Sequence, residues 1–531
     1  RVYVAPFASG NNSLTAAPAA GRRPDHGFGQ EIVRVIDLDG TGYALPDHDL
    51  FEIDSTSGAS TIQPVLRRAG TLLTAHGRHP SGSYWMLNVE SHNKDATRIT
   101  EPSINGIFAS NRVSIGAPAA SNPLPQPAAI DIDDTTPGGP TRTYSASTSL
   151  AFPWSVAFHG SGIALVSASM SDRIGVFDAL GARLTPFDIQ LPAGSIPRHL
   201  QFDPILGSHV IVHCWGTSEL RIYPPLSQTP FAVLSLGEDP APAPIRAGRE
   251  IWYDADRSLH GRTSCNTCHP AGKTDFLSWS LSNAPHDHKD AMVTQSLLSI
   301  EDTFPYHWRG ENDLLAFNDA FTNLLGGAQK LTTGPNSEFD SFQAFVFSLQ
   351  AYANPLEVVE RVVSDTVGGP GVATLGQNLY VNQPSFANRS CNACHTLPTT
   401  TNSDFNLGEI TFLPSQTTLE VAHLREMTHR DQVAIPGPIN VPGLPNLPLV
   451  PRSGTGLTHA GGTPNLAFAM GNFALTPTQR DDVAAFVRQI DSGLSPAAHA
   501  AILIDPQSQA NAAWVQSTLE LQSRKRWIDL V

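Results

Sequence analysis

Ser264-Cys-Asn-Thr-Cys-His269 is repeated further along the chain as Ser390-Cys-Asn-Ala-Cys-His395, and these two stretches decide how the C-terminal half is interpreted. The chain has five cysteines in 531 residues, and four of them lie here. In the pattern Cys-x-x-Cys-His, two thiols add to the vinyl groups of a haem and the histidine binds its iron. The sequence therefore predicts two covalently attached haem c groups. Their attachment residues are Cys265, Cys268 and His269 for haem 1, and Cys391, Cys394 and His395 for haem 2.

A Cys-x-x-Cys pair also occurs in thioredoxin-like redox sites, as half of a zinc site, or by chance. None of these accounts for a histidine after both pairs in a chain so poor in cysteine. The fifth cysteine, Cys214, lies in the apolar run Val210–Trp215, where we expect a buried small side chain with no chemistry, and we assign none to His213.

Composition limits where the chain works and what it binds. Haem c is attached outside the cytoplasm, so we expect an exported bacterial protein, periplasmic or extracellular, and Arg1 is interpreted as a processed start. No apolar run approaches the ~18 residues of a transmembrane segment. A net charge of −15 argues against nucleic acid as a partner, and the length predicts two or three domains.

Residues 1–240 have the texture of β structure, with short alternating apolar runs between Gly, Pro, Asn and Asp. A segment beginning at Val156 is echoed at Leu200, an offset of 44 residues. A period of about 40–50 residues is typical of four-stranded propeller blades, so this region predicts an all-β propeller with room for about five to seven blades. An irregular β-sandwich is the alternative.

Further blade strands are expected at Thr71–His76 and Tyr84–Val89, and the Pro/Ala/Ser-rich stretch 117–147 is expected to be a long insertion. The opening Arg1-Val-Tyr-Val-Ala-Pro-Phe7 resembles a blade strand of YVTN-type bacterial β-propellers, which often precede dihaem modules.

From residue 245 the pattern becomes helical. Phe342, Phe345, Val346 and Leu349 form one apolar stripe, and Thr476-Pro477 announces a second helix with an N-cap and a first-turn proline. We expect two tandem, mainly α-helical cytochrome c domains, at 245–358 with haem 1 and at 366–495 with haem 2. Residues 496–531 are expected to form a C-terminal helical extension.

The two helical domains are predicted to be copies of one unit. Ala247–Tyr253 precedes the first cysteine motif as Leu375–Tyr380 precedes the second. Downstream, His307-Trp-Arg-Gly310 has its counterpart in His459-Ala-Gly-Gly462.

This half resembles the dihaem cytochrome c peroxidase and MauG superfamily over residues 245–495. The matching motifs are Trp252–Ser258, Trp308-Arg-Gly310, Leu424-Arg425 and Thr458–Gly461, in the order that the family has them. The resemblance implies that Trp308 bridges the haems and relays electrons, where the alternative is a core tryptophan. It also implies that Arg309 and Arg425 contact the haems.

The sixth ligand of each iron decides between electron transfer and catalysis. By the same resemblance Met470 is the first choice for haem 2, with His459 as the alternative. For haem 1 four candidates stay open: His286, His288, Met292 and His307. We expect inequivalent irons, because Asn318 stands in the first copy where Met470 stands in the second.

Peroxidases of this type follow the bridging tryptophan with a glutamine and then a glutamate that handles protons. Asn318 and Ala328 stand at about those places, and Asp319 or Glu311 is a substitute acid. Three functions follow as hypotheses: a haem oxidoreductase acting on peroxide or oxygen, a pure electron-transfer cytochrome with two six-coordinate haems docked through its propeller, and a propeller with the main binding role. The expected partners are a small cytochrome or cupredoxin and a small oxidant substrate.

Overall fold

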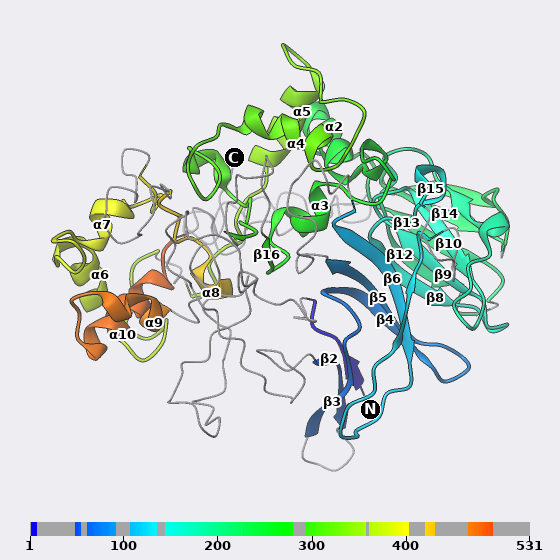
Figure 1. Cartoon of the computed structure of the whole chain (residues 1–531), viewed down its shortest axis with the longest axis horizontal. Coiled ribbons are helices and arrows are strands. Elements are labelled where there is room, and N and C mark those ends of the chain that lie inside the picture. The colour runs from blue at the N-terminus through cyan, green and yellow to red at the C-terminus, as the bar shows by residue number, and fades with distance from the viewer. Residues whose placement is uncertain are drawn as a thin grey trace, which may run out of the picture.

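The computed structural model describes most of the chain in eleven ranges. These are residues 2–7, 48–54, 61–91, 107–134, 144–205, 207–224, 226–279, 292–356, 361–402, 420–430 and 466–491. Figure 1 shows β-sheets on one side of the molecule and helices on the other. The predicted extension 496–531 lies outside the described residues.

The described residues of the N-terminal half form four antiparallel sheets of three or four strands, each built from strands consecutive in the chain. The first holds β1 (Val2–Val4), β2 (His48–Asp54) and β3 (Thr61–Arg67). The second holds β4 (Leu72–Arg78), β5 (Tyr84–Ser91), β6 (Ala109–Gly116) and β7 (Ala128–Asp131). The third holds β8 (Pro153–Phe158), β9 (Ala164–Ala168), β10 (Arg173–Phe177) and β11 (Ile189–Gln190), and the fourth holds β12 (Pro197–Phe202), β13 (Val210–Cys214), β14 (Glu219–Tyr223) and β15 (Ala232–Ser235). Such meanders are blades of a β-propeller-like domain.

The internal repeat is confirmed in the strands themselves. The first strands of the third and fourth sheets, β8 and β12, begin 44 residues apart and pack against each other, and β8 also packs against β4. Apolar cores fill the spaces between neighbouring sheets, as in a propeller. The stretch 117–147 is not only an insertion, since β7 pairs with β6 along Arg112–Ile115 and completes the second sheet.

Two blades share one hairpin turn. In His79-Pro-Ser-Gly82 and His159-Gly-Ser-Gly162, the histidine Nδ1 lies 2.8 and 2.7 Å from the hydroxyl of the serine two residues on. Each turn closes with a glycine at φ +97° or +90°, a conformation that other residues rarely adopt. The turn therefore repeats because the same local hydrogen bonds are satisfied in both blades.

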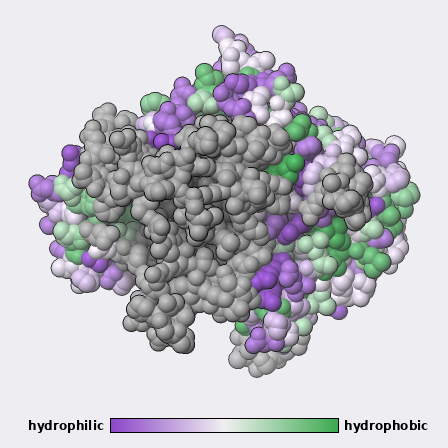
Figure 2. Space-filling model, viewed as in Figure 1, coloured by the Kyte–Doolittle hydropathy of each residue, from purple (hydrophilic) through white to green (hydrophobic). Residues whose placement is uncertain are grey.

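The outer edge of the fourth sheet is apolar. Figure 2 shows hydrophobic residues at the surface on the side of the molecule where the third and fourth sheets lie. Phe231, Leu234 and Leu236, in or beside β15, are 72%, 50% and 52% exposed. β15 ends the strand order of its sheet, so this edge is both exposed and hydrophobic.

The C-terminal half is built of short helices. They are α2 (Ala243–Tyr253), α3 (Cys265–Cys268), α4 (Ala320–Asn323), α5 (Glu338–Phe347), α6 (Ala373–Asn382), α7 (Cys391–Cys394), α8 (Met427–Arg430), α9 (Leu466–Ala469) and α10 (Pro477–Val487), with a two-stranded ribbon of β16 (Ser278–Trp279) and β17 (Met292–Val293). Both predicted helices are present: Phe342, Phe345 and Val346 are buried in α5, and Thr476 caps α10. Among the described residues, no helix is long and apolar enough to cross a bilayer.

Two helix pairs repeat one packing arrangement. Helix α2 packs on α5, and α6 packs on α10. A Cβ added at Gly248 would lie 1.9 Å from the carbonyl oxygen of Ser341, and one added at Gly376 would lie 1.9 Å from that of Asp482. Each glycine thus lets two helix backbones touch.

Four residues after each of these glycines an aromatic ring packs into the same helix pair. Trp252 lies 6.1 Å from Phe342 between ring centroids, and Tyr380 lies 5.1 Å from Phe486. The repeated motif in the sequence is therefore a repeated helix crossing in space.

Candidate functional site

The first cysteine motif begins a single helical turn. Ser264 caps α3: its side chain accepts from the Asn266 amide, and its own amide donates to the Thr267 hydroxyl at 3.0 Å. Cys265 and Cys268 begin and end this turn, and His269 follows as its C-cap. The second motif forms the matching turn α7 after Ser390. Local sequence therefore positions two thiols and one imidazole together in each copy.

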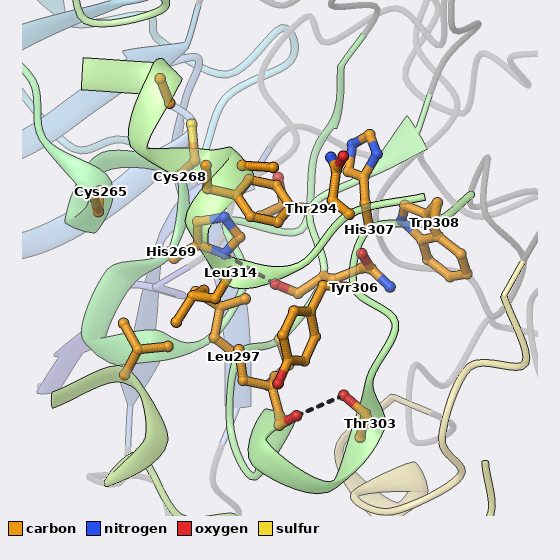
Figure 3. Close-up of a pocket in the computed structure, with 18 of the residues that line it drawn as sticks. Cys265, Cys268, His269, Thr294, Leu297, Thr303, Tyr306, His307, Trp308 and Leu314 are labelled. Atoms are coloured by element: carbon orange, nitrogen blue, oxygen red, sulfur yellow. Dashed lines mark hydrogen bonds between the residues drawn. The ribbon is translucent and has the colours of Figure 1, made fainter. Parts of the chain in front are cut away.

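A cavity of about 700 Å³ opens beside the first motif (Figure 3). Cys265, Cys268 and His269 line it on one side, while His307 and Trp308 lie across from His269. Much of the remaining wall is apolar or aromatic, including Trp252, Leu297, Leu314 and Phe342. A volume of this size suits a ligand of several hundred daltons.

His269 is oriented through its Nδ1 atom. Nδ1 lies 2.9 Å from the carbonyl oxygen of Gln295, to which the ring N–H donates. Burial lowers the pKa of the His269 imidazole to about 4, so the ring is neutral at neutral pH. Metal-binding histidines have this arrangement, because a hydrogen bond at one nitrogen leaves the other nitrogen as a ligand.

His395 of the second motif is held in the same way. Its Nδ1 lies 3.2 Å from the carbonyl oxygen of Thr400, and the backbone of Ala422 also hydrogen-bonds the ring. Burial lowers the pKa of this imidazole too. Both histidines are thus neutral and anchored by main-chain carbonyls.

The thiols of the first motif lack the properties of a reactive pair. Burial raises the pKa of the Cys265 thiol to about 12, whereas redox-active pairs lower the pKa of the attacking cysteine. Cys214 is fully buried, as predicted, and burial raises the pKa of its thiol to about 12 as well.

Trp308 lies where the two copies of the helical unit meet. The side chain is 6% exposed, and its indole N–H donates to the carbonyl oxygen of Val293 at 2.6 Å. Ala422, whose backbone holds His395, packs against the small cluster of Trp308 and Val293. The carbonyl oxygen of Trp308 accepts from the amide of Glu420 at 2.9 Å. Trp308 therefore contacts one segment from each copy.

The segment 420–426 of the second copy closes the cavity of the first. Glu420, His423, Arg425 and Glu426 all line that cavity. The Glu420 carboxyl accepts a hydrogen bond from the side chain of Gln295, and the Ser296 hydroxyl donates to Glu426 at 3.1 Å. Sequence reasoning missed this closure, apart from the Leu424-Arg425 motif.

Glu420 stands out by its electrostatics. Burial, as the largest cause, and the nearby Glu311 carboxylate together raise the pKa of its carboxyl to about 8, against the opposing effect of the Gln295 hydrogen bond. The group is therefore largely uncharged at neutral pH. No local motif marks it, because its environment comes from segments more than 100 residues away.

The propeller-like domain also builds this site. Phe108, just before β6, lines the cavity and packs edge-on against Trp279 with ring centroids 6.0 Å apart. Arg262, three residues before Cys265, is fully buried and pairs with Asp133 at 3.1 Å and Asp131 at 3.3 Å. A buried arginine between Asp131, at the end of β7, and Asp133, just after it, thus fixes the approach to the cysteine motif.

The structure describes the positions of only some of the candidate sixth ligands. His307 lines the cavity, and its Nδ1 lies 2.7 Å from Glu311, which leaves Nε2 available. Met470 is buried in the second-copy core against which Cys391 packs. Met292 is placed in β17 by its backbone, whereas His286, His288 and His459 lie outside the described residues.

Of the positions considered for acid–base chemistry near Trp308, Glu311 pairs with His307 at the cavity, whereas Asn318 and Asp319 bind residues elsewhere. Asn318 is buried and forms two hydrogen bonds with the backbone of Leu331, at 2.8 and 2.9 Å, so it latches a loop. Asp319 lines the cavity but is mostly exposed and pairs with Lys330.

The predicted haem-contacting arginines differ in placement. Arg425 is buried, reaches Asp302 at 3.5 Å and lines the first cavity, although the chain places it in the second copy. Arg309 is half-buried beside Trp308.

Comparison with known proteins gives a limited result. No model of a known protein family matches the chain, and no protein of curated function matches it. Among solved structures, hydrazine synthase of Kuenenia stuttgartiensis is similar at 12% identity, over 33% of this chain and 51% of that one, with a TM-score of 0.25. The same enzyme under xenon gives 13% identity, 48% and 89% coverage and a TM-score of 0.32.

Virginiamycin B lyase of Staphylococcus aureus is similar at 13% identity, over 36% of this chain and 50% of that one, with a TM-score of 0.22. The chain spans about half the length of the first hydrazine synthase structure and of virginiamycin B lyase. At such identities and TM-scores, no activity of those proteins extends to this chain.

Proposed function

We propose that the chain is an exported dihaem c-type cytochrome, a redox protein of the cytochrome c peroxidase and MauG type. The observation that supports this most is the cavity of about 700 Å³ with two thiols and a neutral imidazole on one wall. A haem c group fits these residues: Cys265 and Cys268 supply the thioethers, and the free nitrogen of His269 supplies the iron ligand. The proposal includes a periplasmic or extracellular location.

The second motif supports a second haem. Cys391, Cys394 and His395 repeat the same turn, with an imidazole anchored at Nδ1 and neutral through burial. The repeated helix crossings at Gly248 and Gly376 favour two tandem cytochrome c domains at about 245–358 and 366–495.

Each haem, when bound, supplies one-electron redox chemistry, and the protein side chains organise it. Trp308 is proposed as the relay, since it contacts the segments that hold both proximal histidines. Arg425 supplies a buried positive charge to the first cavity and suits a haem propionate. Met470 is proposed as the second ligand at the second site, because thioethers bind haem iron.

One haem is proposed to transfer electrons while the other acts on peroxide or oxygen. A second candidate, a pure electron-transfer cytochrome, is favoured by one specific observation. His307 lines the first cavity with Nδ1 held by Glu311, so its Nε2 is suited to bind iron. Electron paramagnetic resonance distinguishes the two: a high-spin haem 1 supports the enzyme, and two low-spin haems support the carrier.

The proposal is tested by counting covalent haem. We expect purified protein to keep its haem through denaturation and acetone extraction, and the pyridine haemochrome to give two haems per chain. Cys265→Ala with Cys268→Ala should leave one haem, whereas Cys214→Ala, the matched control at the remaining cysteine, should leave two. Extraction of all haem from the unaltered protein would refute the assignment.

A further inference from the structure

We propose that Glu420 takes up and releases the proton that accompanies electron transfer through the site around Trp308. This inference rests on the proposed function and adds to it a further residue, Glu420, and the transfer of a proton together with the electron. The residues that prompted the cytochrome assignment do not include Glu420.

Glu420 touches both ends of the proposed electron path. Its amide donates to the carbonyl oxygen of Trp308 at 2.9 Å. Its carboxyl accepts from the side chain of Gln295, and the carbonyl of that same glutamine accepts from the His269 ring at 2.9 Å. A change of charge at Glu420 is therefore felt at the proximal histidine and at the relay together.

The carboxyl also has access to the first cavity. It is half-buried and lines the cavity wall, on a segment that the second copy contributes. A group that is enclosed enough to interact strongly with a nearby charge, yet open to a cavity, can exchange a proton with solvent when that charge changes.

The charged neighbours favour the protonated form. On the facing loop, Glu311 raises the pKa of Glu420, and that loop also holds His307 and Arg309. The facing stretch 293–299 contains no titratable side chain. On the segment of Glu420 itself lie His423, Arg425 and Glu426, and Arg425 is paired with Asp302.

The direction of the coupling follows from charge. Reduction of a ferric site adds one electron and removes one positive charge from the neighbourhood, which raises the pKa of a nearby carboxyl. At a pH where Glu420 is ionised in the oxidised protein, one electron then enters with one proton, which binds a carboxylate oxygen of Glu420 from water. Oxidation returns the proton to water, so charge and atoms balance over one cycle.

The experiment is a spectroelectrochemical titration of the two-haem protein between pH 6 and 9. For one electron and one proton, each pH unit is a tenfold change that shifts the midpoint potential by up to about 59 mV. We expect this slope at one haem of the unaltered protein and its loss in Glu420→Gln, while Glu301→Gln, an exposed carboxyl on the neighbouring turn, keeps it. An equal slope in Glu420→Gln overturns the inference.

Two further measurements keep the test decisive. Haem content is counted first in the unaltered protein and in every variant. Absence of haem from the unaltered protein counts against the proposed function. Loss of haem in a variant alone means that the role of Glu420 is decided by measurements on the unaltered protein. In that protein, the infrared difference between oxidised and reduced states should contain a carboxyl C=O band that shifts in D₂O. Glu420→Asp, which keeps an acid, should retain the pH slope. Absence of the band in the unaltered protein overturns the inference even if Glu420→Gln does not fold.

Discussion

Gly248 and Gly376 offer a matched pair of substitutions, because each lies at a helix crossing of one copy. A methyl group at either position would sit 1.9 Å from a backbone carbonyl oxygen, whereas real Cβ contacts essentially never fall below 3.0 Å. The two helices must therefore separate by about 1 Å. Overpacking of this kind costs roughly 3 kcal/mol, a factor of about 150 in the folding equilibrium of that copy.

We expect Gly248→Ala to reduce haem at the first site and Gly376→Ala to reduce it at the second. The assay is the pyridine haemochrome ratio of haem to protein, followed by mass spectrometry of the haem-bearing peptides. Each variant should approach one haem per chain, and the surviving haem should be on the other motif. The same variants should lower the thermal midpoint of the affected copy.

Gly471→Ala and Gly160→Ala are the controls, since no atom lies within 4 Å of a Cβ added at either position. Both should keep two haems and an unaltered melting curve. If Gly248→Ala and Gly376→Ala behave like these controls, the close helix crossings do not hold the cysteine motifs, and the structural argument for two equivalent units fails.

Three further predictions follow from single residues. Trp308→Phe should slow electron transfer between the haems at unchanged haem content, and an unaltered rate in flash photolysis would exclude the relay. Arg262→Met leaves Asp131 and Asp133 buried without a counter-charge, so the free energy of unfolding should fall by about 3–5 kcal/mol in a denaturant titration, and a loss below about 1 kcal/mol would contradict the buried pairing. The raised pKa of Glu420 means that the folded state binds a proton more tightly than the unfolded state, so the carboxyl stabilises the fold fully below about pH 4.5 and loses this effect as the pH rises to about 8. Between these values the free energy of unfolding of the unaltered protein should fall by up to about 1.4 kcal/mol per pH unit because of Glu420, and Glu420→Gln should abolish this part of the fall. Parallel pH profiles of the two proteins would contradict the prediction.

What could be predicted from the sequence was mostly local. The blade repeat, the cap at Thr476 and the burial of Cys214 are each indicated by a short stretch of sequence, and the structure confirms them. The duplicated helix before each cysteine motif is also recognisable in a short stretch of sequence, although the helix crossing that requires Gly248 is made with the distant Ser341.

What could not be predicted depends on contacts across the chain. Glu420 becomes an uncharged carboxyl because burial and the nearby Glu311 carboxylate raise its pKa, and Glu311 lies more than 100 residues away in the chain. Phe108 reaches the first cavity from a blade, which no spacing in the sequence indicates. Asn318 is the opposite case. The family resemblance places a catalytic residue at about this position, whereas in the structure the Asn318 side chain hydrogen-bonds the backbone of Leu331.

The buried ion cluster of Arg262 with Asp131 and Asp133 has a consequence for biogenesis. Chains fold from the N-terminus as they emerge, so the second sheet is available before the first cysteine motif arrives. Once Arg262 docks, the thiol of Cys265 three residues later is held in place beside a formed wall. Under the proposed haem attachment, the attaching enzyme must therefore act on the motif before Arg262 docks, or on a surface that the blade has already shaped. The order of these two events would then set the yield of mature protein.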